Sequence, residues 1–264
     1  MSELRLRGSV TVVTGGSSGI GLATASALLE EGGSVLVVAR DPDRLAGTAR
    51  RLDGPGGRLQ TLVLDVCDTS AGSRVLAAVE AAFGRVDGLV NVAGASGLHD
   101  LESSDDAEWY RQWELNVMAP KRLMDALAPQ MAAGPGGSIV NVCSSAGGRA
   151  SATNAPYSVT KRAEIALTKV YAERYEGTGV RVNAIAPAPK MTDLWVRPGG
   201  RADQAAAAAG LDREEDLASV AAGLPLQRLA AAEEVAAVVL LSLARRTIGA
   251  VWGVDGGHVP EVSN

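Results

Sequence analysis

The chain alternates short runs of β-branched and other apolar residues with longer, alanine-rich stretches of helical pattern, almost from end to end. This order of elements is typical of a parallel sheet whose strands are connected by crossover helices. Because the apolar runs lack a polar face, helices are expected on both sides of the sheet, which favours an open doubly wound α/β fold over a sandwich. The seven expected strands are VTVVT (10–14), SVLVVA (34–39), LQTLVLD (59–65), DGLVNV (87–92), SIVNVC (138–143), VRVNAI (180–185) and AVWGVD (250–255).

Most intervals between these runs predict single helices, at 19–31, 42–52, 69–83, 106–132, 156–176 and 232–244. The interval 187–226 is different, because it has no strand pattern but carries its own alanine-rich helical stretch at 202–222. Long connections of this kind are often lids or binding loops, so we expect a substrate lid here, with a solvated insertion as the alternative.

Composition limits the class of protein. With 264 residues, 47% hydrophobic residues and no long polar linker, the chain is expected to form a single domain over 1–264. Its net charge of −5 argues against a nucleic-acid partner, which requires a basic surface. The N-terminal sequence resembles no secretory signal, and no apolar run reaches membrane-spanning length, so we expect a cytoplasmic protein with no membrane partner.

Cysteine and histidine are too sparse for a metal site or a disulfide framework. Cys67 and Cys143 each lie in a strand-like run, and we expect both to be core thiols. His99 and His258 are far apart in the sequence and have no neighbouring ligand pair. We therefore expect no metal ion.

A glycine-rich segment, TGGSSGIG (14–21), follows the first expected strand and leads directly into a helix. Gly15, Gly19 and Gly21 give the spacing TGxxxGxG. Glycines there allow a tight turn and let backbone N–H groups and the helix N-terminus approach a pyrophosphate. A plain strand-to-helix connector is the alternative. The second strand ends at Arg40, nineteen residues beyond Gly21, where the ribose of an adenosine would lie.

Further motifs follow in a fixed order, and together they closely resemble the short-chain dehydrogenase/reductase family over nearly the whole chain. Beyond the glycine segment they are Asp65-Val66, NVAG (91–94), Asn116 in ELNVMAP, Ser144 in NVCSSAG, YSVTK (157–161), NAIAPAPKMT (183–192) and VDGG (254–257). Two positions depart from the family pattern: Val92 replaces an asparagine, and Ala188 replaces a glycine. Ser144 is preferred to Ser145, expected to cap or pack, because Ser144 precedes the motif tyrosine by the family's interval of thirteen residues.

The resemblance implies a Rossmann-like doubly wound sheet and a specific set of site residues. The implied catalytic residues are Asn116, Ser144, Tyr157 and Lys161. The implied cofactor-binding residues are Gly15, Ser17, Ser18, Gly19, Ile20, Gly21, Arg40, Asp65, Val66, Asn91, Ala93, Gly94, Tyr157, Lys161, Pro187 and Thr192. Simpler roles compete at three of these positions: Asn116 could bond local backbone, Asp65 could end a strand, and Thr192 could cap a helix.

Tyr157 and Lys161 are four residues apart in an expected helix, so their side chains share one face. A neighbouring ammonium favours the phenolate, which can take a proton from an alcohol or, once protonated, return it to a carbonyl. The pair alone could equally be a surface aromatic and a solvated charge, but Ser144 and Asn116 in register favour catalysis. The resemblance implies that Ser144 orients the substrate oxygen and that Asn116 holds a water chain leading to the lysine. The cofactor carries the hydride.

The end of the second strand indicates which cofactor is used. Relatives that prefer NAD have an acidic residue at the position aligned with Ala39, whereas Arg40 resembles the basic residue of relatives that prefer NADP. A guanidinium suits phosphate oxygens. NADP(H) is therefore favoured, and NAD(H) stays possible because the carboxylate of Asp41 could reach the ribose instead.

These observations predict an oxidoreductase that transfers a hydride between NADP(H) and a small or medium, largely apolar carbonyl or alcohol. Ser144, Met191 and Trp195 are the expected substrate contacts. The alternatives are an NAD-dependent alcohol dehydrogenase, a non-redox dehydratase or isomerase, and a catalytically silent binding protein. The helical stretches 106–132 and 156–176 resemble those that pair between subunits in this family, so we expect a homotetramer.

Overall fold

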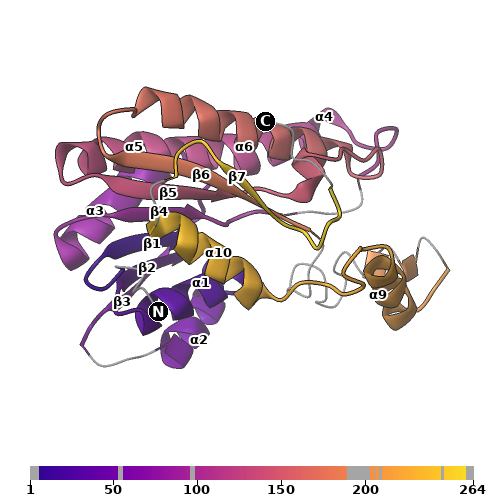
Figure 1. The fold of residues 1–264 in the computed structure, drawn as a ribbon, viewed down its shortest axis with the longest axis horizontal. Helices are drawn as coiled ribbons and strands as arrows, with labels where there is room; N and C mark the ends of the chain where they lie inside the picture. The colour runs from indigo at the N-terminus through magenta and orange to yellow at the C-terminus, as the bar shows by residue number, and fades with distance from the viewer. Residues whose placement is uncertain are drawn as a thin grey trace.

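The computed structural model of the protein describes residues 6–52, 56–95, 99–188, 203–204, 206–207, 210–244 and 247–259. Within these residues the seven apolar runs form one parallel sheet in the order β3-β2-β1-β4-β5-β6-β7 (Figure 1). The strands are β1 (Val10–Thr14), β2 (Ser34–Ala39), β3 (Leu59–Val63), β4 (Gly88–Asn91), β5 (Gly137–Val142), β6 (Val180–Pro187) and β7 (Val251–Val254). The predicted Rossmann-like, doubly wound sheet is confirmed.

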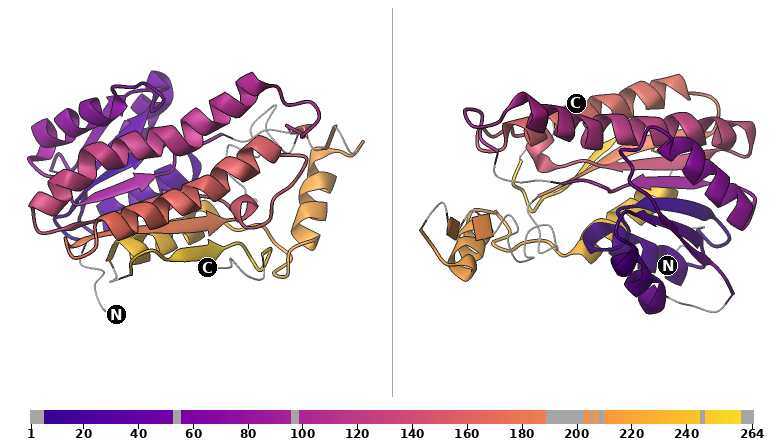
Figure 2. Two further views of the ribbon diagram at one scale, coloured as in Figure 1. Left: turned by 90° about the horizontal axis from the view of Figure 1, so that it is seen from above. Right: turned by 180° about the vertical axis from the view of Figure 1, so that it is seen from behind.

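Both faces of the inner strands β1, β2, β4, β5 and β6 are buried, as the apolar runs predict, whereas the edge strands β3 and β7 are partly exposed. Val12 and Val13 are neighbours on β1 and both are fully buried, yet they belong to different core clusters on opposite faces. One face packs against α3 (Ala71–Phe83), α5 (Ala119–Ala133) and α6 (Ala155–Arg174). The other packs against α1 (Gly19–Glu30), α2 (Pro42–Leu52) and α10 (Ala232–Ala244). Figure 2 shows α5 and α6 from above, lying over the first of these faces.

The order of the strands determines where a ligand can bind. The chain builds outward from β1 through β2 to β3, and then returns to the other side of β1 to place β4, β5, β6 and β7. Strand order therefore reverses between β1 and β4. In open α/β sheets the crevice at the carboxyl ends of the strands on either side of this reversal is the usual ligand site.

The helix predicted over 106–132 is confirmed in its extent, but it is not a regular α-helix throughout. The structure has α4 (Asp106–Trp113), a turn of π-helix η1 (Glu114–Met118), and then α5. The backbone N–H of Ala119 donates to the carbonyl of Glu114, five residues earlier. Pro120 explains this π turn, because proline has no N–H to donate to the carbonyl of Asn116. In a regular α-helix its ring would also collide with that carbonyl. Asn116 lies in the middle of this π turn.

The helical stretch predicted over 202–222 is interrupted at 210–212. The helix α9 spans only Arg213–Ala222, and Gly210, with φ of 68°, adopts the left-handed conformation that ends helices. Asp212 then caps α9, accepting a hydrogen bond from the N–H of Glu215 at 2.8 Å. Part of the predicted lid, 189–202, lies outside the described residues, so the lid remains a prediction. Figure 1 shows α9 apart from the sheet.

Strand ends differ from expectation by up to two residues. β3 ends at Val63 rather than at Asp65, and β6 extends to Pro187 rather than ending at Ile185. The extension of β6 occurs because Pro187 pairs with Val254 of β7. Across the described residues, no helix is both long and apolar enough to cross a bilayer.

Candidate active site

The end of β1 is hydrogen-bonded to the segment that follows β4, at the point where the strand order reverses. The side chain of Thr14 accepts hydrogen bonds from the N–H groups of Val92 at 3.1 Å and Ala93 at 3.2 Å. Gly15 has φ of 65°, and a Cβ at this position would lie 2.9 Å from the backbone nitrogen of Ala93. Only glycine therefore allows this close approach of two backbone segments.

The helix α1 begins directly at this loop and presents its N-terminus to the cleft. Its N-cap residue, Ser18, makes no side-chain cap hydrogen bond, and its first turn contains no acidic residue. The partial positive charge of the helix N-terminus is thus left for an anionic ligand. Gly21 has a packing role, because a side chain there would collide with the backbone of Gly15.

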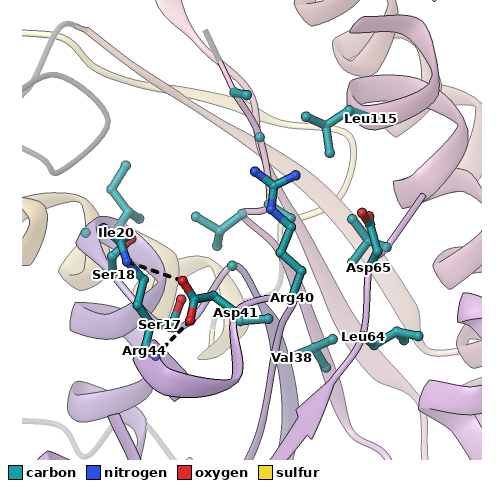
Figure 3. Close-up of a pocket in the computed structure, with 18 of the residues that line it drawn as sticks. Ser17, Ser18, Ile20, Val38, Arg40, Asp41, Arg44, Leu64, Asp65 and Leu115 are labelled. Atoms are coloured by element: carbon teal, nitrogen blue, oxygen red, sulfur yellow. Dashed lines mark hydrogen bonds and ion pairs between the residues drawn. The ribbon is translucent and has the colours of Figure 1, made fainter. Parts of the chain in front are cut away.

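A cleft of about 460 Å³ lies at this edge of the sheet (Figure 3). Ten of the predicted cofactor-binding residues line it: Gly15, Ser17, Ser18, Gly19, Ile20, Arg40, Asp65, Val66, Ala93 and Gly94. The lining also includes residues that the sequence analysis did not assign to it: Val38, Ala39, Asp41, Arg44, Leu64, Val92, Ala95, Arg111 and Leu115. The volume is in the range of small-molecule sites.

Arg40 and Asp41 have different environments at the cleft rim. Arg40 is exposed and lines the cleft. Asp41 is the N-terminal cap of α2: its Oδ1 accepts hydrogen bonds from the N–H groups of Asp43 and Arg44, each at 3.0 Å. Its Oδ2 lies 3.9 Å from Nε of Arg44 (Figure 3). Both carboxylate oxygens of Asp41 therefore already have partners within α2.

Asp65 forms a turn beyond the end of β3 and also lines the cleft. Its Oδ1 accepts a hydrogen bond from the N–H of Cys67 at 2.9 Å, which forms the turn that follows β3. The same residue lines the cleft next to Val66. The turn holds the Asp65 side chain at the cleft wall opposite the glycine loop.

Asn116 is the end of a hydrogen-bonded chain of side chains at successive intervals of four residues. Gln112 donates to Oε1 of Glu108 at 2.9 Å, and Asn116 donates to Oε1 of Gln112 at 2.7 Å. A carboxylate only accepts, so Glu108 fixes the direction of both amides. Nδ2 of Asn116 also donates to Oγ1 of Thr160 at 3.2 Å, while its buried Oδ1 has no hydrogen-bond partner among the described residues.

This oxygen of Asn116 lies close to Gly94. A Cβ at Gly94 would lie 3.5 Å from Oδ1 of Asn116 and 3.7 Å from Nζ of Lys161. Gly94 itself lines the cleft. The structure thus brings three of the predicted site residues together at the inner end of the cleft.

Lys161 is buried, with its side chain 3% exposed. Its Nζ donates to the carbonyl of Val142 at 3.2 Å and to Oε2 of Glu164 at 2.7 Å, and it lies 5.7 Å from the ring centroid of Tyr157. Burial alone would lower the pKa of Lys161, but Glu164, together with Tyr157 and Cys143, raises the pKa above its ordinary value. Lys161 is therefore a cation beside Tyr157 at neutral pH.

Ser144 lies at the end of β5, where it caps the short 3-10 helix η2 (Ser145–Gly147). Its Oγ accepts a hydrogen bond from the N–H of Ala146 at 3.1 Å. Of the two roles expected for Ser145, packing is the one observed, because this residue is 3% exposed and the cap is Ser144. η2 packs on α6, since a Cβ on Gly147 would lie 2.9 Å from the carbonyl oxygen of Lys161.

The described lining of the cleft does not include seven other predicted site residues: Gly21, Asn91, Asn116, Ser144, Tyr157, Lys161 and Pro187. Asn116 and Lys161 nevertheless lie close to Gly94, which is part of the lining. Asn91 donates to Oδ1 of Asn141 at 2.8 Å inside the core. The remaining three predicted residues, Met191, Thr192 and Trp195, lie outside the described residues.

The sequence analysis missed three residues that contact the predicted site: Glu108, Gln112 and Glu164. The spacing of the first two was available, because residues 108, 112 and 116 follow the i, i+4 interval of one helix face. Glu164 follows Lys161 by three residues, which is also an interval on one helix face.

Comparison with known proteins agrees with the geometry. A sequence model of the short chain dehydrogenase family matches residues 9–198. The oxidoreductase YvrD of Bacillus subtilis, whose function is uncharacterized, is 34% identical, with 97% of this chain and 98% of that protein covered. D-threitol dehydrogenase of Mycolicibacterium smegmatis is 33% identical, covering 97% of this chain and 95% of that one.

A solved structure has the same fold across its whole length. L-sorbose reductase from Gluconobacter frateurii, in complex with NADPH and L-sorbose, superimposes with a TM-score of 0.91 and 34% identity. The match covers 98% of this chain and 100% of that one. Because the family model spans well over half of the sequence and full-length relatives exceed 30% identity, the chain belongs to the short-chain dehydrogenase family of oxidoreductases.

Proposed function

We propose that the protein interconverts a carbonyl compound and the corresponding alcohol with NADP(H), using Tyr157 as the general acid and base. One observation carries the proposal: Lys161 lies beside Tyr157, and Lys161 and Asn116 both lie close to Gly94, which lines the cleft. This is the end of the cleft where a nicotinamide would lie if its adenosine occupied the strand ends of β2 and β3.

The residues of the cleft fit a dinucleotide. Gly15, which packs against the backbone of Ala93, puts no side chain between the glycine loop and a ligand. Backbone N–H groups of the loop and the N-terminus of α1 can therefore hold a pyrophosphate. Asp65 and Val66 would hold the adenine, and Lys161 the nicotinamide ribose. A bound nicotinamide supplies or accepts the hydride, and the protein supplies position and proton transfer.

Proton transfer falls to Tyr157. The fixed positive charge of Lys161 favours the phenolate form of the neighbouring phenol, which takes the hydroxyl proton when an alcohol is oxidised. In the reverse direction the same phenol gives its proton to the carbonyl oxygen. Ser144 would bind that oxygen and fix its orientation, and the unpartnered Oδ1 of Asn116 would hold the water that resupplies Lys161.

Preference for NADP(H) rests on the cleft rim. Ala39 has no charged side chain to bind an unphosphorylated ribose. Oδ1 of Asp41 accepts hydrogen bonds from the N–H groups of Asp43 and Arg44, and its Oδ2 lies near the guanidinium of Arg44, so this carboxylate is not poised to bind that ribose either. Arg40 lines the cleft and is exposed, which suits a 2′-phosphate. The structurally similar L-sorbose reductase was solved with NADPH.

The class of substrate remains a finer proposal. We favour a small or medium, largely apolar carbonyl compound, with Ser144, Met191 and Trp195 as contacts. A polyhydroxylated substrate is the second candidate, because two relatives are named for D-threitol and L-sorbose. The two candidates differ in hydrogen-bonding demand, so a matched panel of apolar ketones and ketoses separates them.

The test is an absorbance assay of NADPH and NADH with this panel, run in both directions. We expect turnover with at least one panel member and a kcat/KM for NADPH roughly tenfold or more above that for NADH, which is the value of one charge-assisted hydrogen bond. Equal or better use of NADH would contradict the cofactor assignment. Product formation without net change in NADPH would instead support a dehydratase or isomerase, and cofactor binding without any turnover a silent binding protein.

We also propose a homotetramer. Large apolar side chains on α4 and α6 are exposed in the single chain: Tyr110 at 73%, Val159 at 47% and Val170 at 59%. Faces of this kind commonly mark protein interfaces. Light scattering is expected to give about four times the chain mass of 27.0 kDa, and a monomer at micromolar concentration would contradict the proposal.

A further inference from the structure

We propose that Glu164 is a positioning residue of the active site, whose carboxylate orients Lys161 and sets the pH range in which Tyr157 transfers protons. This inference rests on the proposed function of Tyr157 and Lys161 and assigns a role to a residue that the family motifs do not include. Its starting point is a buried ion pair within one helix, in direct contact with the proton-transfer residues.

The ion pair is short and shielded from water. Oε2 of Glu164 lies 2.7 Å from Nζ of Lys161, and each side chain is 3% exposed. A lone carboxylate or a lone ammonium would be very unfavourable at this depth, so each charge depends on the other. Replacing Glu164 leaves Lys161 without its counterion, and the effect therefore reaches the reacting groups.

Helix geometry links the pair to Tyr157. Glu164 lies three residues after Lys161 and seven after Tyr157 on α6, so the three side chains share one face of the helix. An ammonium has three hydrogen-bond donors. Glu164 and the carbonyl of Val142 take two of the donors of Lys161, which leaves the third for the side occupied by Tyr157 and Gly94. Glu164 thereby orients the ammonium.

The charges that surround the pair are few. Within the described residues, the titratable groups acting on Lys161 are Glu164 and Tyr157 on α6 itself and Cys143 at the end of β5. Burial raises the pKa of Cys143 well above its ordinary value, so the thiol stays neutral. Burial also raises the pKa of Glu164, an effect that the ammonium of Lys161 opposes. The amide of Asn116, on η1, is neutral.

Electrostatics then gives the sign of the effect. Removing a negative charge from a buried site favours the deprotonated form of every neighbouring acid, both the phenol of Tyr157 and the ammonium of Lys161. The pH at which Tyr157 becomes a base falls, and so does the pH at which Lys161 loses its charge. Both limbs of the pH–rate profile are therefore expected to move in the same direction, toward lower pH.

The experiment compares Glu164→Gln, which removes the charge and keeps the shape, with Glu164→Asp, which keeps the charge. Glu173→Gln, at an exposed position on the same helix, is the matched control. In the pH dependence of kcat, Glu164→Gln is expected to shift both limbs down by about one pH unit or more, because the charge removed lies in a site shielded from water. Glu164→Asp and Glu173→Gln are expected to leave both limbs in place.

A second measurement needs neither cofactor nor turnover. The ultraviolet absorbance of tyrosinate is titrated in each protein and in its Tyr157→Phe counterpart, and the difference reports on Tyr157 alone. The midpoint is expected to be lower in Glu164→Gln than in the wild-type protein. This shift tests the role of Glu164 even if the protein turns over no carbonyl compound, so failure of the proposed function is distinguishable from failure of this inference.

Thermal unfolding identifies any variant that does not fold. If Glu164→Gln is unfolded, Glu164→Met is a second neutral replacement of similar length, and the same shift of the Tyr157 midpoint is expected. Loss of kcat with unmoved limbs and an unmoved tyrosinate midpoint would show a purely structural role and overturn the inference. An upward shift would overturn it as well.

Discussion

The two ends of the cleft are constructed in different ways. The glycine-loop end, formed by Gly15, Ser17–Ile20 and Arg40, depends on backbone approach and on an exposed cation. The proposed proton-transfer end, formed by Asn116, Tyr157, Lys161 and Glu164, depends mostly on buried, hydrogen-bonded side chains: Asn116 donates to Gln112, and Lys161 donates to Glu164. The first end is open to solvent, whereas most of the polar groups of the second are removed from it.

This difference teaches what each end can tolerate. An exposed charge is screened by water and salt, so its replacement is expected to change ligand affinity and little else. A buried hydrogen-bonded group is supported by its partners, and its replacement leaves those partners unsatisfied. Substitutions at the glycine-loop end should therefore act on cofactor affinity, and substitutions at the proton-transfer end on kcat and stability. The predictions below test that division.

The largest effect is expected for Tyr157→Phe. The change deletes the proton carrier and almost no volume, so kcat is expected to fall by about 10²–10⁴-fold, the usual contribution of general acid catalysis. The Kd for NADPH, measured by fluorescence titration, is expected to stay within about threefold of wild type. Tyr110→Phe, on the exposed face of α4, is the matched control. A Tyr157→Phe variant that keeps more than about a tenth of wild-type kcat would exclude the assigned role.

The next effect is expected at the other end of the cleft. Arg40→Ala removes a charge-assisted contact to a 2′-phosphate, which contributes about 1.5–3 kcal/mol, so the Kd for NADPH is expected to rise about 10–100-fold. The Kd for NADH and the melting temperature are expected to stay unchanged, because Arg40 is exposed. Arg50→Ala, in the last turn of α2, controls for the loss of one positive charge. A parallel loss of NADH affinity would show that Arg40 supports the loop rather than selecting the cofactor.

A smaller effect is expected for Gln112→Leu. Gln112 is fully buried, and its amide is oriented by Glu108 and in turn orients the amide of Asn116. Leucine at this position leaves Nδ2 of Asn116 with Thr160 as its one remaining acceptor among the described residues. Loss of one buried partner costs about 1–3 kcal/mol, and we expect kcat to fall roughly tenfold with little change in the Kd for NADPH. Gln130→Leu, at an exposed position on α5, is the control. Unchanged kcat in a folded variant would show that the chain does not orient Asn116.

The division between the two ends also explains what could be predicted from the sequence. The glycine loop and Arg40 follow strands at fixed distances along the chain, so their meeting at one edge of the sheet was predictable from the alternation of elements. The π turn before Pro120 also has a local cause, because proline cannot donate the hydrogen bond that a regular α-helix needs. Both features are local.

The partners at the proton-transfer end were harder to predict. A glutamate three residues after a lysine on a helix is usually a solvated pair, and only the packing of η2 and β5 on α6 shows that Lys161 and Glu164 are buried. The direction of the Asn116 amide depends on Glu108 and Gln112 together, which no single motif encodes. Tertiary packing, rather than sequence spacing, determines these contacts.

The smallest effect is expected for Asp41, and it separates a structural carboxylate from a cofactor ligand at the glycine-loop end. Asp41 caps α2 through the N–H groups of Asp43 and Arg44, so Asp41→Ala is expected to cost about 1 kcal/mol of stability, a fall in Tm of roughly 2–4 °C. Asp41→Asn keeps a capping oxygen and is expected to retain most of that stability. Neither change removes a ligand of NADPH, so the Kd for NADPH is expected to stay the same or to fall slightly as a negative charge leaves the rim. If Asp41→Ala instead weakens NADH binding about tenfold and leaves Tm unchanged, the carboxylate of Asp41 binds the ribose. The cleft would then be suited to NAD(H), and the structural role of Asp41 would be wrong.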